Sequence, residues 1–382
     1  MTSVERKAGR YERRKAAREA KRNEKLTAFD DFNQVADADN LFASFNRSKL
    51  GVSWKESVQR YEANAMRNIA DTRKKLLAGQ SVQSGFMEFT LNERGKIRHI
   101  KSVHISERVV QKCLCDYCLN PILTRPLIYD NGASIKNKGV HFALKRLIVH
   151  LTKFYNNNGR SNHGYALLVD FSKFFDSIDH AVLFQLLEKQ ITDQRVLALT
   201  RSFVSVFGPG KSLGLGSQVS QTAAIFYPNT LDHYIKEQLR IKYYGRYMDD
   251  MYLIHSDKDY LKHCLSEIRR ICAELKITIN ERKTRIVKLS SGMEFLKGRY
   301  FLQESGRVLR RPGRDSTIRM RRKLVKFKAL INEGKMAVED LRTAYQSWRG
   351  NYRRRFNAYY QVRYMDMLYN RLFIFDRDTI GG

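Results

Sequence analysis

Hydrophobic and polar positions follow two different periods along the chain, and each change of period marks a new segment. From about Phe29 to Leu77 the apolar residues recur at helical spacing, which predicts two or three packed helices. Short apolar runs over 86–91 and 96–100, joined by a Gly-containing turn, predict a β-hairpin. A continuous apolar run over 165–169 predicts a strand buried on both faces. Helical spacing returns over 261–275.

A second pair of strands is predicted around two adjacent acids. In the stretch Tyr243–His255, Asp249 and Asp250 interrupt aromatic and aliphatic runs, a pattern typical of a hairpin with its acids at the turn. Asp170 ends the buried strand before it. Three aspartates on two neighbouring strands could hold two Mg²⁺ ions, with Mn²⁺ as an expected substitute, and such a site serves phosphoryl transfer. The alternative is that Asp249 and Asp250 are plain turn residues, since Asp hydrogen-bonds its own backbone there.

Charge changes the picture more than composition does. The 382 residues are 43% hydrophobic, an ordinary value, but 70 Lys and Arg against 39 Asp and Glu leave a net charge of +31. A surplus of this size favours a nucleic-acid partner. No run of about 18 apolar residues could span a bilayer, and the N-terminus has no apolar signal core, so we expect a cytoplasmic protein without a membrane partner.

The sequence Tyr247-Met-Asp-Asp250 resembles motif C of the reverse transcriptases, and further motifs stand in the family's order. Residues 164–180, with Asp170 at the end of the strand, are similar to motif A. The resemblance implies that Asp170, Asp249 and Asp250 are the metal ligands and catalytic residues. It also implies that Phe175 is the aromatic steric gate that excludes a 2′-hydroxyl and selects dNTPs. The alternative for Phe175 is a simple core position.

A Gly-rich run over 208–221 occupies the place of motif B, before a helix that we expect from about Thr222. The resemblance implies that four residues here bind the substrate: Leu215, Gly216, Ser220 and Gln221. Most reverse transcriptases have Gln where this chain has Leu215. The form aliphatic-Gly-x-x-x-Ser-Gln is similar to the enzymes of diversity-generating retroelements, which copy with low fidelity.

The remaining motifs concern the fingers and the thumb. Lys96 and Arg98 correspond to basic fingers residues that contact the triphosphate in the family, although both also suit an ordinary exposed strand. Lys283 corresponds to the motif D lysine, a candidate proton donor to pyrophosphate, and 295–298 resembles the primer grip. Residues 310–363 hold 16 basic and 4 acidic side chains, which suits the backbone of a hybrid duplex. Solvated helix charge is the alternative.

Together these features predict an α/β chain of the α+β kind with a right-hand polymerase architecture. We expect a basic N-terminal arm over 1–28, fingers and palm with an antiparallel sheet over 29–305, and a basic helical thumb with a C-terminal tail over 306–382. The arm would lie on RNA or be a solvated tail. The predicted enzyme is an RNA-directed DNA polymerase, a nucleotidyltransferase that uses an RNA template, a DNA or RNA primer and dNTPs.

The biological setting has several alternatives. A diversity-generating retroelement is the first, and a defence-associated (antiphage) reverse transcriptase copying a non-coding RNA is the second. An intron-type relative and a catalytically inactive RNA-binding protein on the same scaffold complete the set. A cognate structured RNA and a small accessory protein are further candidate partners.

Overall fold

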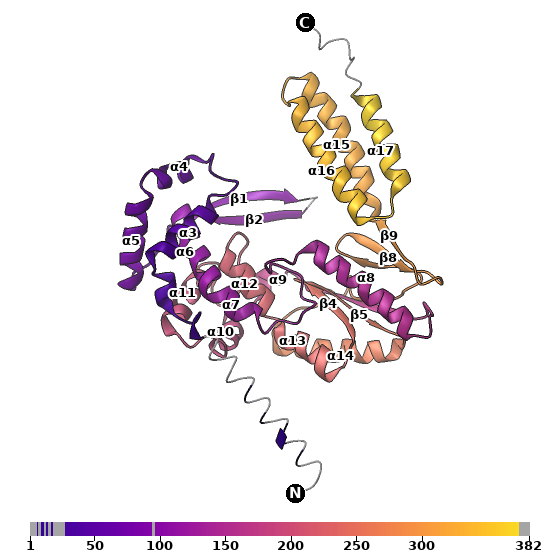
Figure 1. Ribbon diagram of the computed structural model, residues 1–382, viewed down its shortest axis with the longest axis horizontal. Coiled ribbons are helices and arrows are strands. Elements are labelled where there is room, and N and C mark those ends of the chain that lie inside the picture. The colour runs from indigo at the N-terminus through magenta and orange to yellow at the C-terminus, as the bar shows by residue number, and fades with distance from the viewer. Residues whose placement is uncertain are drawn as a thin grey trace.

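The computed structural model describes residues 27–93 and 96–373, together with isolated positions before them (Arg6, Gly9, Arg10, Arg13 and Ala17). The expected N-terminal arm lies almost entirely outside the described residues. The described chain forms a helical part with a protruding hairpin, a central sheet covered by helices, and a bundle of helices at the C-terminal end (Figure 1). We call these three parts the fingers, the palm and the thumb, the names that the sequence resemblance implies.

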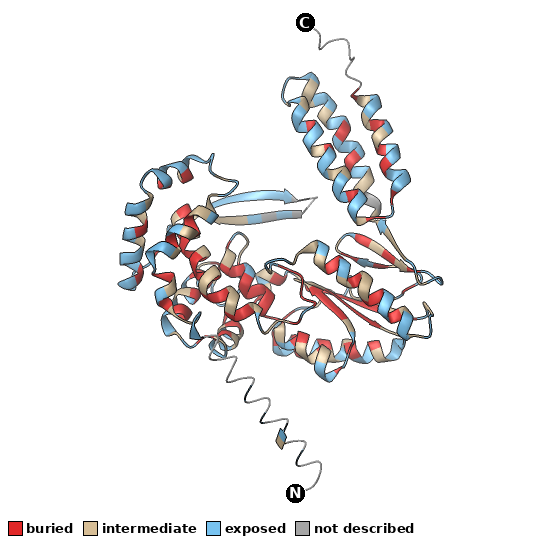
Figure 2. Cartoon of the chain, viewed as in Figure 1, coloured by how far each residue is buried: buried red, intermediate tan, exposed pale blue. Residues whose placement is uncertain are grey.

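The fingers contain the helices and the hairpin that the sequence predicted. The helices are α2 (Phe32–Val35), α3 (Ala38–Ser48), α4 (Glu56–Ala63), α5 (Ala65–Leu77), α6 (Ile105–Leu114), the π-helical turn η1 (Cys115–Leu119) and α7 (Asn120–Thr124). The hairpin pairs β1 (Phe86–Glu93) with β2 (Lys96–Val103) in antiparallel register. Its residues are mostly exposed, whereas α6 and η1 are largely buried and carry three core cysteines, Cys113, Cys115 and Cys118 (Figure 2).

The palm is a four-stranded antiparallel sheet in the order β4-β5-β3-β6. Its strands are β3 (Tyr165–Asp170), β4 (Tyr243–Tyr247), β5 (Asp250–His255) and β6 (Arg285–Lys288). One face packs on α8 (Val140–Asn157) through Ala166 and Leu168, and the other packs on α14 (Lys258–Glu274) through Leu167 and Val169. Successive side chains of a strand point to opposite faces. The continuous apolar run of β3 is therefore explained by helices on both sides of the sheet.

Further helices lie beside the fingers helices and next to α14 below the sheet (Figure 1). They are α9 (Phe174–Ser177), α10 (His180–Glu188), α11 (Gln194–Ser205), α12 (Gln218–Phe226), α13 (Asn229–His233) and the π-helical turn η2 (Tyr234–Gln238). The expected start of α12 at about Thr222 was wrong, because the helix begins at Gln218. Ser217 caps it, accepting a hydrogen bond from the backbone N–H of Ser220 at 3.3 Å.

A small antiparallel sheet joins the palm to the thumb. It contains β7 (Met293–Phe295), β8 (Gly298–Leu302) and β9 (Val308–Pro312), in that order. Gly306, expected at the domain boundary, has φ of 78° and lies in the turn between β8 and β9. The first thumb helix begins after β9, at Arg314.

The thumb is formed by α15 (Arg314–Asn332), α16 (Val338–Arg355) and α17 (Tyr359–Leu372) around a separate apolar core. The mixture of helices and antiparallel sheets confirms the predicted fold class. Among the described residues, no helix combines the length and the apolar character needed to cross a bilayer.

Candidate active site

Two of the three predicted metal aspartates lie opposite each other on neighbouring strands of the palm sheet. Asp170 is the last residue of β3, and Asp250 is the first residue of β5. The two strands are antiparallel, and their register places Asp170 directly opposite Asp250. Residues that are opposed in an antiparallel pair point to the same face of the sheet. Both carboxylates therefore lie at the same end of this strand pair and on the same face of the sheet.

The third aspartate lies in the tight turn that joins β4 to β5. Met248 begins this turn with φ of 55°, a left-handed conformation that side chains adopt at a cost. Asp249 follows, and its backbone carbonyl accepts a hydrogen bond from the N–H of Phe171 at 3.3 Å. This hydrogen bond holds the turn against the residue that follows Asp170. The backbone positions of the three aspartates are therefore fixed relative to one another.

A buried ion pair lies beneath this turn. The side chains of Arg246 and Asp232 are both fully buried and are joined by hydrogen bonds as short as 2.6 Å. Arg246 also donates to the carbonyl of Met248 at 3.0 Å and to that of Ile225 at 2.8 Å. Tyr244 donates its hydroxyl hydrogen to Asp232. The guanidinium therefore fixes the position of the residue that precedes Asp249.

The electrostatics of the aspartates are those of crowded negative charge. Burial raises the pKa of Asp250 to about 7, with further contributions from the carboxylates of Asp249 and Asp170 and an opposing one from Lys283. Lys283 donates to both carboxylate oxygens of Asp170, at 2.7 and 2.8 Å. Burial lowers the pKa of Lys283, but its hydrogen bond to Asp170 and the three nearby carboxylates outweigh that effect and raise it.

The side chains at this end of β3 and β5 have the chemistry needed to bind a divalent cation. In the part of the chain that the structure describes, no three His, Cys, Asp or Glu side chains are already arranged as a metal-binding group. Asp170 and Asp250 nevertheless supply the hard oxygen ligands that Mg²⁺ prefers. Burial and, after it, repulsion from Asp249 and Asp170 raise the pKa of Asp250, and a bound cation would relieve that repulsion.

Phe175, the expected steric gate, lies beside the motif B loop. Its backbone carbonyl accepts a hydrogen bond from the N–H of Leu213 at 2.9 Å. Its ring is only partly buried, whereas the neighbouring ring of Phe174 is in the core, 6.0 Å away between centroids. Of the two rings, Phe175 is the more exposed, and it packs against the edge of the core without lining the cleft described below.

The motif B residues occupy different environments. Leu215 is half-buried, and its carbonyl accepts a hydrogen bond from the N–H of Lys101 on β2 at 3.2 Å. Gly216 has φ of 120°, and a Cβ there would come within 2.6 Å of the Lys101 carbonyl, so glycine is required where the loop passes β2. Gln221 is exposed. Ser220 is fully buried and donates its hydroxyl hydrogen to the Leu213 carbonyl, so it holds the loop together.

Lys96 and Arg98 lie on β2 of the fingers hairpin. Their side chains are outside what the structure describes, and their expected contact with a triphosphate stays a prediction. The hairpin itself connects to the site through its hydrogen bond to the motif B loop.

A cleft of about 1300 Å³ runs from the two aspartates to the thumb. At the palm end Asp170, Asp250 and Lys283 line it. At the thumb end the lining comes from α15 and α16, with Arg319, Lys323, Trp348, Asn351, Tyr352 and Arg355 among its residues. The expected primer-grip residues Phe295 and Gly298 lie between the two ends. Such a mixture of cations and aromatic rings suits a nucleic-acid backbone.

Sequence reasoning missed two parts of this site. Asn280 donates its side-chain amide to Asp170 at 3.0 Å and its backbone N–H to the Asp170 carbonyl at 2.7 Å. The Arg246–Asp232 pair was also missed. A charged residue within an otherwise apolar strand was the available signal for Arg246, because a buried charge requires a partner. No such signal marked Asn280.

The fold and the opposed aspartates define the class: a palm, fingers and thumb of the right-hand polymerase kind. Residues 90–301 match the family model of reverse transcriptase (RNA-dependent DNA polymerase). This match covers more than half of the sequence, and the chain belongs to the reverse transcriptase family. Family membership confirms the predicted enzyme class, a nucleotidyltransferase.

No curated protein matches the sequence. Solved structures with a similar fold include telomerase from Candida albicans with a TWJ fragment of telomeric RNA, at TM-score 0.48 and 11% identity, over 65% of this chain and 51% of that one. Apo telomerase from Candida tropicalis without its C-terminal domain gives TM-score 0.46 and 13% identity, over 64% and 60% of the two chains. The longer Candida tropicalis structure gives 0.43 and 12%, over 63% and 52%. This chain spans between 51% and 60% of the length of those telomerase chains.

Proposed function

We propose that this chain is an RNA-directed DNA polymerase that extends a primer by nucleotidyl transfer at Asp170, Asp249 and Asp250. The observation that carries this proposal is the register of β3 and β5, which sets Asp170 opposite Asp250 at one end of a cation-lined cleft. Two carboxylates that repel each other at one end of a cation-lined cleft lower the stability of the fold when no cation is bound. Such an arrangement suits a reaction in which a bound cation neutralises their charge.

The proposed roles follow from position. Asp170, Asp250 and Asp249 would hold Mg²⁺, with Mn²⁺ as a substitute. Ions held there would supply Lewis-acid stabilisation of the charge that develops on the transferred and leaving phosphates. Lys283 keeps its proton because of the surrounding carboxylates, and it is the proposed donor of that proton to pyrophosphate. Asn280 orients Asp170 through its amide.

Substrate selection is assigned to the residues around the Gly-rich loop. The ring of Phe175 would exclude a 2′-hydroxyl, so that dNTPs are used. Leu215, Gly216 and Gln221 would border the nascent base pair, with Ser220 holding the loop behind them. Lys96 and Arg98 would contact the triphosphate from the hairpin.

For the biological setting we propose an error-prone enzyme of a diversity-generating retroelement. The support is Leu215 at the position where most of the family has Gln, because a leucine side chain has no hydrogen bond to offer a correctly placed nucleotide. The gene neighbourhood tests this setting. A template repeat with a variable repeat supports it, whereas a structured non-coding RNA in a phage-defence region supports the antiphage alternative.

Primer extension tests the polymerase activity itself. The purified chain is given an RNA template with an annealed primer and dNTPs, with Mg²⁺ or with a chelator. The proposal expects Mg²⁺-dependent extension. Retained RNA binding without extension on any primer would favour the inactive RNA-binding alternative.

A further inference from the structure

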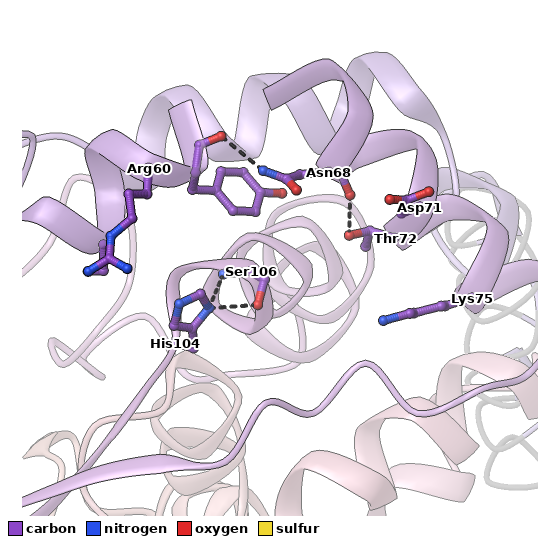
Figure 3. A pocket seen from close by; sticks show the side chains of 9 residues that line it. Arg60, Asn68, Asp71, Thr72, Lys75, His104 and Ser106 are labelled. Atoms are coloured by element: carbon purple, nitrogen blue, oxygen red, sulfur yellow. Dashed lines mark hydrogen bonds between the residues drawn. The ribbon is translucent and has the colours of Figure 1, made fainter. Parts of the chain in front are cut away.

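The fingers contain a polar pocket of about 480 Å³ between α4, α5 and the start of α6 (Figure 3). Helices α4 and α5 lie on the far side of the fingers from the palm sheet (Figure 1). The pocket is therefore separate from the cleft that holds Asp170 and Asp250. Its volume lies within the range of about 300 to 1,000 Å³ that is usual for small-ligand pockets.

Three basic side chains from three different elements meet at this pocket. Arg60 comes from α4, Lys75 from α5, and His104 caps the N-terminus of α6. Figure 3 shows Arg60 and Lys75 on opposite sides of the pocket, with His104 and Ser106 between them. The only carboxylate among the described lining residues is that of Asp71. The balance of charge at the pocket therefore favours an anion.

These basic groups are available to a ligand. Lys75 forms no side-chain hydrogen bond or ion pair that the structure records, and Arg60 pairs with Glu56 at 2.7 Å on an exposed surface, an interaction of little strength. The backbone N–H of Ser106 donates to Nδ1 of His104 at 3.3 Å. A neutral His104 ring therefore carries its proton on Nε2, where it is a hydrogen-bond donor.

A buried tyrosine forms one wall of the same pocket. Tyr61 lines the pocket and is only 6% exposed, and its hydroxyl oxygen is closed off from solvent next to the Thr72 hydroxyl. The hydroxyl of Thr72 donates its own hydrogen to the Asn68 carbonyl at 2.7 Å. The Tyr61 ring therefore shapes the pocket, and its hydroxyl is not part of the surface that a ligand can reach.

We propose that this pocket binds a phosphate group, either of an RNA strand or of a free nucleotide. A phosphate has several acceptor oxygens and negative charge, which match two permanent cations, an imidazole N–H and the hydroxyl of Ser57. The start of α6 adds the partial positive charge of a helix N-terminus. This inference does not depend on the proposed polymerase activity.

Chemical footprinting of two neighbouring lysines tests the proposal on the intact protein. Lys75 lines the pocket, whereas Lys74, also exposed on α5, does not. The rate of acetylation of each is measured by mass spectrometry with inorganic phosphate, dATP or a 5′-hydroxyl RNA oligonucleotide, at constant ionic strength. A probe at ten times its Kd should slow modification of Lys75 about tenfold and leave Lys74 unchanged. Equal effects on both lysines with every probe would overturn the proposal.

Variants provide an independent test and identify the source of the phosphate. Lys75→Ala and Arg60→Ala should each weaken binding of the protecting probe by roughly tenfold, while Lys74→Ala and Arg67→Ala leave it unchanged. Protection by dATP alone assigns a free nucleotide, and protection by the oligonucleotide alone assigns RNA. Matched losses in the pocket variants and their controls would contradict the site.

Discussion

Arg246 and Asp232 form an ion pair that is closed off from solvent beneath the turn carrying Asp249. Both side chains are 0% exposed, and Arg246 also donates to the carbonyl of Met248. The pair connects the position of the turn to the core between α13 and the sheet. Removing one partner leaves the other as an uncompensated buried charge, which is among the most destabilising changes a core can undergo.

Asp232→Asn should therefore lower the free energy of unfolding by about 3 to 5 kcal/mol. The measurement is urea denaturation at pH 7. Glu281→Gln, which breaks the exposed pair with Arg269, is the matched control and should change stability by less than about 1 kcal/mol. Equal losses in the two variants would show that the buried pair is not a major support of the fold.

The carboxylate of Asp130 should make stability depend on pH in the acid range. Burial alone would raise the pKa of Asp130, but hydrogen bonds from His150 and Arg146 outweigh it and lower the pKa to about 2. An unfolded Asp titrates near 4, so the stabilisation from this carboxylate is complete above about pH 4 and is lost as the pH falls toward about 2.

Denaturation curves from pH 7 to pH 2 test this expectation. Asp130→Asn should be less stable than the wild type at pH 7, and the difference should shrink between about pH 4 and pH 2. Glu304→Gln alters an exposed acid and is the control for general charge effects. A difference that stays constant over the whole range would mean that Asp130 is not stabilised as a carboxylate.

The sugar choice of the enzyme is expected to depend on Phe175. Phe175→Ala should raise NTP incorporation with little loss of dNTP incorporation, because it opens space where a 2′-hydroxyl would otherwise clash. Single-nucleotide incorporation kinetics with dNTPs and NTPs measure the ratio. Phe174→Leu changes the neighbouring core ring and should leave the ratio unchanged. An unaltered ratio in Phe175→Ala would place this ring outside the sugar site.

Fidelity is expected to depend on the side chain at position 215. An amide there could hydrogen-bond the incoming nucleotide, and one such contact contributes roughly 1 kcal/mol, enough to change misincorporation severalfold. Leu215→Gln should therefore copy RNA more accurately and more slowly, while Leu215→Met, which adds no amide, should keep the wild-type error rate. Sequencing of cDNA made from a defined RNA compares the three proteins. Identical error spectra would show that position 215 does not contact the nascent pair.

Local patterns predicted much of the fold because the apolar periods of this chain are clear. The continuous run of β3, the hairpin around Asp249 and the helical spacing over 261–275, which corresponds to α14, were all visible in the sequence. The start of α12 was misplaced because the Gly-rich run hid a single capping residue, Ser217.

Contacts between distant segments could not be predicted in the same way. The hydrogen bonds from Asn280 to Asp170 and the ion pair between Arg246 and Asp232 depend on how α13 and the segment before β6 pack against the sheet. A one-dimensional pattern shows which residues are apolar, but it does not show which polar groups meet. The phosphate pocket depends in the same way on the packing of α4 and α5 against α6.

The Asp170, Asp249 and Asp250 carboxylates are proposed to hold the metal ions for nucleotidyl transfer. The most direct measurement compares the wild type with Asp249→Asn on one preparation each, scoring Mg²⁺-dependent primer extension on RNA and RNA affinity together. We predict that extension is abolished, since a ligand charge is lost, while RNA affinity stays nearly the same because it depends on the basic cleft. Extension by the variant at the wild-type rate would contradict the assignment of the active site.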